Sequence, residues 1–254
     1  MNADSSRRVA RGVWTVLSGF VVESLVFALA VLPAALFWAW HFRLSLPVNW
    51  LRTLVLTLAF VPAYLLFAFG LIVFSALVTR LLGWRTPAGM EMRIADMEWP
   101  LLRWARYMIS QHIVRLFAGA FFRSTPVWTL YLRLNGAKMG RGVFVNSLVL
   151  TDHNLLEFGD GVVIGSDVHL SGHTVEAGVV KTAPVRLGKN VTVGTGSVIG
   201  IGVEIGDNTQ VGALSLIPKH RTLAANAVYV GVPVRRLDAP EPGEPVATSQ
   251  VPLG

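Results

Sequence analysis

The carboxy-terminal half of this 254-residue chain contains a six-residue repeat. From Leu187 to Ile217 an aliphatic residue returns at every sixth position, and glycine follows each of the first five. The fifth residue of each hexad is small or β-branched, namely Val191, Ser197, Val203, Thr209 and Ser215. Two inward-facing side chains per hexad and a glycine at each corner predict a parallel β-helix, in which three short faces form one coil and coils stack about 4.8 Å apart.

The repeat continues upstream with one small and one large interruption. Grouping the inward positions in threes predicts four coils, which are Met139, Val145 and Thr151; Phe158, Ile164 and Leu170; Leu187, Val193 and Ile199; and Ile205, Val211 and Ile217. The large interruption predicts a loop, roughly residues 171–186, that leaves the second coil. Long loops on a rigid scaffold are where functional residues concentrate.

The amino-terminal part is too apolar for an ordinary soluble chain, since 53% of all residues are hydrophobic and only 15% are charged. The stretch 13–40 carries one charged residue, Glu23, and 54–78 carries none. Roughly 20 apolar residues are enough to span a bilayer as a helix. We therefore predict two transmembrane helices, 13–40 and 50–80, within a first domain of residues 1–95.

The arginines around these helices predict an orientation. Three arginines precede the first helix and three follow the second, whereas two lie between the helices. The positive-inside rule then predicts a multi-pass protein of the plasma membrane whose termini and β-helix are cytoplasmic. A cleavable signal peptide is the alternative for the first segment, but its apolar run is longer than a typical signal core. A carboxylate inside a membrane helix is costly, so Glu23 is a functional candidate by default.

Residues 96–135 alternate apolar side chains with arginines, which predicts amphipathic helices lying on the membrane surface. The alternative is core helices that pack against the β-helix, with their arginines on a solvated face. The β-helix then occupies residues 136–237, and the proline-rich tail 238–254 is expected to be disordered. Nucleic-acid binding is not expected, because no clustered basic face or known motif is present. The absence of cysteine excludes disulfides, zinc–thiolate sites and a cysteine nucleophile.

A polar cluster is expected where the loop leaves the second coil. If Thr151 and Leu170 are equivalent in successive coils, His153 lies beneath Gly172, at about 5 Å. The candidate site is therefore the set Asp152, His153, His173 and Glu176. A carboxylate that fixes the tautomer of a histidine makes it an effective general base near neutral pH. We expect Asp152 or Glu176 to orient His173; the alternative is that His173 caps a loop or makes a contact between subunits.

The hexads, the histidine in the loop Ser-Gly-His173-Thr-Val-Glu-Ala-Gly, and the closing Val230-Gly-Val-Pro-Val-Arg235 resemble the hexapeptide-repeat acyltransferases, which include maltose and galactoside O-acetyltransferases. The resemblance implies a left-handed parallel β-helix that assembles as a homotrimer. It also implies acyl-CoA in a groove between subunits and His173 as the general base that activates the acceptor. This chain has Val234 where the family has alanine, and it lacks the tryptophan that many relatives carry after the loop.

A second resemblance covers more of the chain. The runs Phe122-Arg-Ser-Thr-Pro-Val-Trp128, Leu132-Arg-Leu-Asn-Gly-Ala-Lys-Met-Gly140 and Pro184-Val-Arg-Leu-Gly188 resemble the membrane-embedded carboxy-terminal region of ε-poly-lysine synthetases. Those enzymes are nonribosomal peptide synthetases, so the resemblance implies amide or isopeptide formation from a pantetheine thioester. We find no adenylation domain or carrier-protein motif in this length, and expect a carrier protein or peptide synthetase to supply the donor.

The expected protein is a membrane-anchored acyltransferase that moves an acyl or aminoacyl group from a CoA or pantetheine thioester to a hydroxyl or amine. Candidate donor-binding residues are two corner glycines, whose N–H groups could stabilise an oxyanion, and three cations for the donor's phosphates, namely Gly194, Gly212, Lys219, Arg235 and Arg236. The alternatives are a non-catalytic trimeric scaffold or regulatory module, and a γ-type carbonic anhydrase. The latter needs three histidines on one metal, and the separation of His169 and His173 is not the usual one; we expect no metal.

Overall fold

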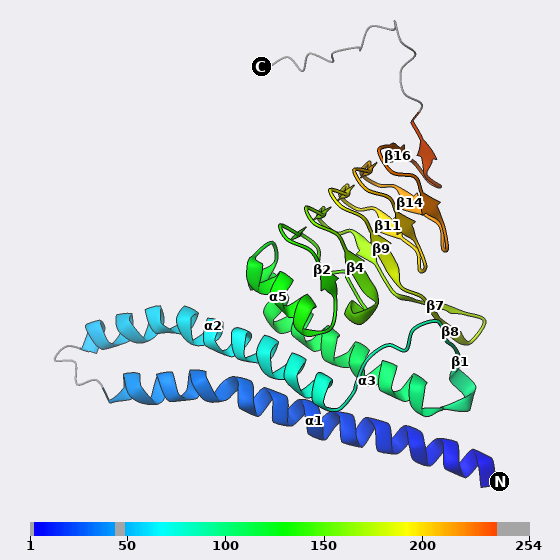
Figure 1. Ribbon diagram of the computed structural model, residues 1–254. Coiled ribbons are helices and arrows are strands. Elements are labelled where there is room, and N and C mark those ends of the chain that lie inside the picture. The colour runs from blue at the N-terminus through cyan, green and yellow to red at the C-terminus, as the bar shows by residue number, and fades with distance from the viewer. Residues whose placement is uncertain (1–2, 44–48, 238–254) are drawn as a thin grey trace, which may run out of the picture.

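The computed structural model describes residues 3–43 and 49–237 of the chain (Figure 1). Two long helices come first, α1 (Ala3–Phe42) and α2 (Asn49–Leu81), and they lie side by side. Both are long and apolar enough to cross a membrane, with a mean hydropathy of 2.3 in their most apolar windows. Each extends beyond the predicted spans 13–40 and 50–80. The predicted disorder of residues 238–254 lies outside the described residues.

A layer of shorter helices separates this pair from the β domain. It consists of α3 (Trp99–Val114), the π-helical turn η2 (Arg115–Gly119), α4 (Ala120–Phe122) and α5 (Pro126–Leu134). Tyr107 of α3 and Trp128 of α5 are each 1% exposed, and the Trp128 indole donates to the Ser147 carbonyl at 3.0 Å. Arg106 is also buried and donates to the Ser18 hydroxyl of α1 at 2.5 Å. These helices therefore bury one side against the long helices and the β domain, and Arg106 is not solvated, while Ile109, Leu116 and Phe121 are more than half exposed. Their predicted position on the membrane surface stays a prediction.

The β domain is built from short strands that form three parallel sheets. The first contains β2 (Lys138–Met139), β4 (Leu156–Phe158), β9 (Val185–Leu187), β12 (Glu204–Ile205) and β15 (Thr222–Leu223). The second contains β3 (Phe144–Val145), β5 (Val163–Ile164), β10 (Thr192–Val193), β13 (Gln210–Val211), β16 (Val228–Val230) and the antiparallel β17 (Arg235–Arg236). The third contains β6 (His169–Leu170), β11 (Val198–Ile199) and β14 (Leu216–Ile217). From β9 to β16 the chain visits the three sheets in turn.

The pairing register follows the six-residue repeat. Val193 pairs with Val211 and Ile199 with Ile217, eighteen residues or three hexads apart. Side chains at the predicted inward positions of these strands are almost fully buried and form the core. One predicted position is wrong: Leu150, and not Thr151, pairs with Leu170. This face is one residue shorter than a hexad, and the 3₁₀ turn η3 (His153–Leu155) restores the register before β4.

The predicted loop 171–186 is mostly a β-hairpin, formed by β7 (His173–Glu176) and β8 (Val179–Thr182). A third strand, β1 (Glu91–Arg93), pairs with β8 in an antiparallel orientation. It belongs to the segment that connects α2 to α3, so this connection ties the hairpin to the helical part of the chain (Figure 1). The 3₁₀ turn η1 (Ile94–Asp96) then leads into α3.

Candidate active site

His173 is the first residue of β7, where the hairpin leaves the coils. It pairs with Thr182 of β8 across the base of the hairpin. Thr182 is itself buried, and its hydroxyl donates to the Pro87 carbonyl at 2.6 Å. The Met90 amide in turn donates to this hydroxyl at 3.0 Å. These bonds tie the base of the hairpin to the segment 87–90, and through Thr182 they fix the position of the His173 backbone.

Asp152 is the partner of His173. Its Oδ2 lies 2.5 Å from Nδ1 of His173, and its side chain is fully buried. The Gly172 amide donates to the same oxygen at 3.1 Å. A Cβ at Gly172 would lie 2.9 Å from the Asp152 Cβ, so glycine is needed for this close approach. The one-residue shift at Leu150 thus places Asp152, rather than His153, beneath Gly172.

Several further donors surround the Asp152 carboxylate. Thr86 donates to Oδ1 at 2.6 Å and the Trp104 indole at 3.2 Å, while Thr151 donates to Oδ2 at 3.1 Å. Burial by itself would raise the pKa of Asp152, but the hydrogen bond and charge of His173, with the hydroxyls of Thr86 and Thr151, lower it overall. Asp152 is therefore a buried carboxylate that stays ionised, because donors replace the lost water.

This arrangement fixes the chemistry of the imidazole. An ionised carboxylate accepts only, so Nδ1 of His173 carries the proton that it donates to Asp152. No hydrogen bond joins Nε2 to any residue in the described part of the chain. Nε2 of neutral His173 is then free to accept a proton, and Asp152 stabilises the imidazolium that results. The pair has the geometry of a general base with its orienting carboxylate.

The His173 ring, whose side chain is 23% exposed, lines a pocket of about 280 Å³. One wall is formed by Trp104 and Gln111 of α3 with Arg115 of η2, and the other is the edge of the first coil near Thr151. The Trp104 ring meets the imidazole edge to face, with 5.0 Å between centroids. A substrate group in this pocket would therefore be in reach of the histidine.

His153 has a different environment from the one predicted. It is 1% exposed, its Nε2 is hydrogen-bonded to the Leu150 carbonyl at 3.1 Å, and its ring packs edge to face on Tyr107 and Tyr131. Burial lowers the pKa of His153 to about 4. It borders the pocket but has no hydrogen bond to His173, so the prediction that it joins the polar cluster is wrong.

Glu176 also lies away from His173. It ends β7, at the tip of the hairpin, where it forms ion pairs with Lys219 and, at 3.8 Å, with Lys181. The prediction that Glu176 could orient the histidine is therefore wrong, because the four-residue strand separates the two side chains. Lys219 was predicted to bind the donor's phosphates, and it is engaged by this carboxylate.

The two corner glycines do not present free donors. The amide of Gly194 donates to the Val211 carbonyl and that of Gly212 to the Tyr229 carbonyl, each at 2.8 Å. These N–H groups belong to the ladder between coils, so the geometry does not support their expected use for an oxyanion. Arg235 and Arg236 are exposed on β17, and their role in donor binding stays a prediction.

Glu23 lies in α1, far from His173 in the sequence and on a different element of the structure. It is 8% exposed, and neither carboxylate oxygen has a hydrogen-bond partner among the described residues. It borders an apolar hollow of about 510 Å³ between α1 and α3. A role for Glu23 stays a prediction.

Sequence reasoning missed four residues of this site: Thr86, Trp104, Gln111 and Ser171. The first three lie 41 to 66 residues before Asp152, outside the repeat, and no periodic signal connects them with it. Ser171 could have been found, because it begins the predicted loop; its hydroxyl lies 3.1 Å from Nδ1 of His173. No group of three potential metal ligands occurs within residues 3–43 and 49–237.

The chain is similar in sequence to several curated relatives. It is 26% identical to delta-poly-L-ornithine synthetase of Acinetobacter baumannii over 164 residues, which are 62% of this chain and 12% of that protein. It is 37% identical to galactoside O-acetyltransferase of Escherichia coli over 105 residues, which are 38% of this chain and 51% of that enzyme. The chain thus spans about half, or far less, of the length of these relatives. No family model matches the chain.

The structure of a galactoside acetyltransferase in complex with coenzyme A aligns with 59% of this chain and 86% of its own, at 24% identity and a TM-score of 0.44. The sequence similarity to the Escherichia coli enzyme and to the ornithine-polymer synthetase repeats the two predicted resemblances. The relatives of this chain include acyltransferases and a poly-ornithine synthetase, and the predicted resemblance to the hexapeptide-repeat acyltransferases is confirmed.

Proposed function

We propose that the protein is an acyltransferase in which His173 activates a hydroxyl or amine acceptor for attack on a thioester. The observation that carries this proposal is the 2.5 Å contact between His173 Nδ1 and the buried, ionised Asp152, with Nε2 unpartnered beside a pocket. Relatives named as an O-acetyltransferase and as a poly-ornithine synthetase support acyl transfer to oxygen or nitrogen.

The proposed step follows from the tautomer. Nε2 of His173 removes a proton from the acceptor as its oxygen or nitrogen attacks the thioester carbonyl, and a tetrahedral intermediate forms. Collapse of the intermediate breaks the carbon–sulfur bond and releases a thiolate, to which the imidazolium returns the proton. The products are an ester or amide and a free thiol, so His173 is regenerated in each cycle.

We place this reaction at a membrane. Along α1 many large apolar side chains are more than half exposed, including Val16, Phe20 and Leu36. Such a surface on a folded chain indicates an apolar environment. In our proposal α1 and α2 span the bilayer, both termini and the β domain are cytoplasmic, and the acceptor is bound at the membrane.

The assembly is also a proposal. We infer a left-handed winding of the three parallel sheets and a homotrimer with the donor in the groove between subunits, as the family resemblance implies. A carrier protein or peptide synthetase would deliver the thioester. Arg235 and Arg236 remain the candidates for the donor's phosphates, because they are exposed and lie on the last strand.

The experiment is a transfer assay with the full chain in detergent. Radiolabelled acetyl-CoA is incubated with the protein and a membrane lipid extract, and both labelled product and free thiol are measured. We expect both to appear with the wild-type chain in equal amounts. Failure to bind the thioester or to form product with any hydroxyl or amine supplied would instead favour the non-catalytic scaffold.

A further inference from the structure

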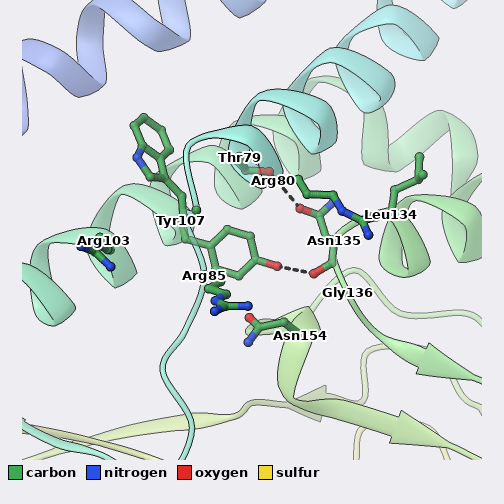
Figure 2. A pocket seen from close by; sticks show the side chains of 11 residues that line it. Thr79, Arg80, Arg85, Arg103, Tyr107, Leu134, Asn135, Gly136 and Asn154 are labelled. Carbon is green, nitrogen blue, oxygen red and sulfur yellow. Dashed lines mark hydrogen bonds between the residues drawn. The ribbon is translucent and has the colours of Figure 1, made fainter.

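A second pocket lies where α2 ends. It has a volume of about 410 Å³, within the range of about 300–1,000 Å³ that is usual for small-molecule sites. Arg80, Arg85 and Arg103 line it from three different segments of the chain (Figure 2). An adjoining hollow of about 450 Å³ shares Arg85, Arg103 and Asn154 with it. Because they share these residues, we treat the two hollows as one site, which we call the arginine pocket.

The arginine pocket is strongly basic. No acidic residue is among those that line either hollow. Within residues 3–43 and 49–237 no ion pair involves Arg80, Arg85 or Arg103, whereas other exposed cations, such as Arg186 and Lys138, are paired with glutamates. Three cations around one hollow repel one another, and an anion would relieve that repulsion. The guanidinium fork binds phosphate oxygens in a bidentate manner.

The floor of the pocket is built from groups that are already held in place. The Tyr107 hydroxyl donates to the Asn135 carbonyl at 3.0 Å (Figure 2). Asn154 accepts from the Thr86 amide at 3.2 Å and donates to the Thr86 carbonyl at 2.8 Å. A ligand would therefore enter a site that needs little rearrangement beyond the arginine side chains, which lowers the entropic cost of binding.

The same groups connect the arginine pocket to the candidate active site. Thr86 lines the adjoining hollow and donates to Asp152 Oδ1 at 2.6 Å, so this one residue forms the wall between an anion and the catalytic pair. Met90 also lines the hollow and is hydrogen-bonded to Thr182, the strand partner of His173. A ligand held by the arginines would lie against the back of the site.

Two apolar side chains that follow Arg80 in the sequence are exposed. Leu81 and Leu82, at the end of the second apolar helix, are 74% and 49% exposed. Together these features point to one ligand chemistry: we propose that the arginine pocket binds the phosphate group of a ligand other than the thioester donor. The binding of this ligand does not depend on the proposed acyl transfer.

Binding is tested by calorimetry on the full chain in detergent, with dihexanoyl phosphatidic acid, dihexanoylglycerol and inorganic phosphate as probes. The variant replaces Arg80, Arg85 and Arg103 by glutamine. The control replaces Arg93, Arg141 and Arg221, three exposed arginines elsewhere, and has the same net charge. We expect phosphatidic acid to bind about ten-fold or more weakly to the pocket variant, with the control unchanged. Arg85→Gln alone should weaken binding about three-fold or more, even if the triple variant does not fold.

The probes separate the two sources of phosphate. Phosphatidic acid that binds about ten-fold more tightly than inorganic phosphate indicates a lipid headgroup, and equal affinities indicate a free phosphate; dihexanoylglycerol should not bind. The proposal is overturned if no phosphate probe binds, if the control weakens binding as much as the pocket variant, or if coenzyme A displaces the probe. If phosphatidic acid binds His173→Ala as tightly as the wild type, the arginine pocket stands as a phosphate site even where no acyl transfer is detected.

Discussion

At the scale of single residues, the chemistry depends on Asp152 more than on any other neighbour of His173. Its carboxylate is buried, ionised and 2.5 Å from the imidazole. Asp152→Asn keeps the size of the side chain, and asparagine also tolerates the left-handed backbone at this position, where φ is 53°. An amide can no longer stabilise the imidazolium, so the acyl-transfer rate should fall about 100-fold or more.

The matched control for this change is Asp167→Asn. Asp167 has nearly the same backbone conformation, with φ 55°, but it is exposed and paired with Arg123 at 3.2 Å. Its replacement should leave the rate within about two-fold, since exposed ion pairs contribute little. Equal rates for Asp152→Asn and the wild type would remove the carboxylate from the mechanism.

His153 predicts a dependence of stability on pH. Its pKa is about 4 in the folded chain and 6.5 ordinarily, so the unfolded chain binds the proton first as pH falls. The contribution of neutral His153 to the free energy of unfolding is therefore complete above about pH 6.5. It is lost as the pH falls to about 4, by up to about 3 kcal/mol. The melting temperature of the wild type should drop between pH 7 and pH 5 by more than that of His153→Gln. Parallel pH profiles for the two chains would contradict this.

The sequence located His173 and Asp152 because both lie in or beside the repeat. It placed His153 and Glu176 wrongly for two different physical reasons. The first error comes from one missing residue in the coil before Leu150, which places Asp152, rather than His153, beneath Gly172. The second error comes from predicting a loop where the chain forms a hairpin. The extended strand β7 keeps His173 and Glu176 apart at its two ends, whereas a loop could have brought them together.

At the scale of elements, the glycine corners decide whether the coils can stack. A Cβ at Gly194 would lie 2.4 Å from the Ala213 nitrogen, which is backbone of the next coil and cannot move aside alone. Gly194→Ala should therefore destabilise the β domain by about 1–3 kcal/mol. The melting temperature measures this, with the exposed neighbour Thr195→Ala as the control. A Gly194→Ala chain as stable as the control would mean that the corner is looser than described.

The elements that the repeat does not include could not be placed from the sequence. Trp104 and Thr86 lie on α3 and on the connection before β1, and they reach Asp152 only because those segments fold over the first coil. The same holds for β1, whose pairing with β8 has no local signal. The six-residue period of 187–217 predicted the sheets. Contacts of the helices and connections with the coils leave no such period in the sequence, so they could not be predicted.

At the scale of the whole molecule, the proposed orientation can be tested because the chain has no cysteine. Single cysteines are introduced at Asn49, which begins α2, and at the exposed Lys189 of the β domain. In intact cells a membrane-impermeant maleimide should label Asn49→Cys and should label Lys189→Cys only after permeabilisation. Labelling of both positions before permeabilisation would contradict a cytoplasmic β domain, and labelling of neither would contradict the span.

The central claim is that His173 is the general base of a thioester-dependent acyl transfer. The most direct measurement is the rate of thiol release from acetyl-CoA in the presence of acceptor, compared among the wild type, His173→Ala and His220→Asn. His220 is an exposed histidine on a distant coil with φ 56°, which asparagine tolerates. We predict that His173→Ala loses about 100-fold or more of the rate while the chain stays folded, and that His220→Asn keeps the rate. A His173→Ala chain as active as the wild type would contradict the account.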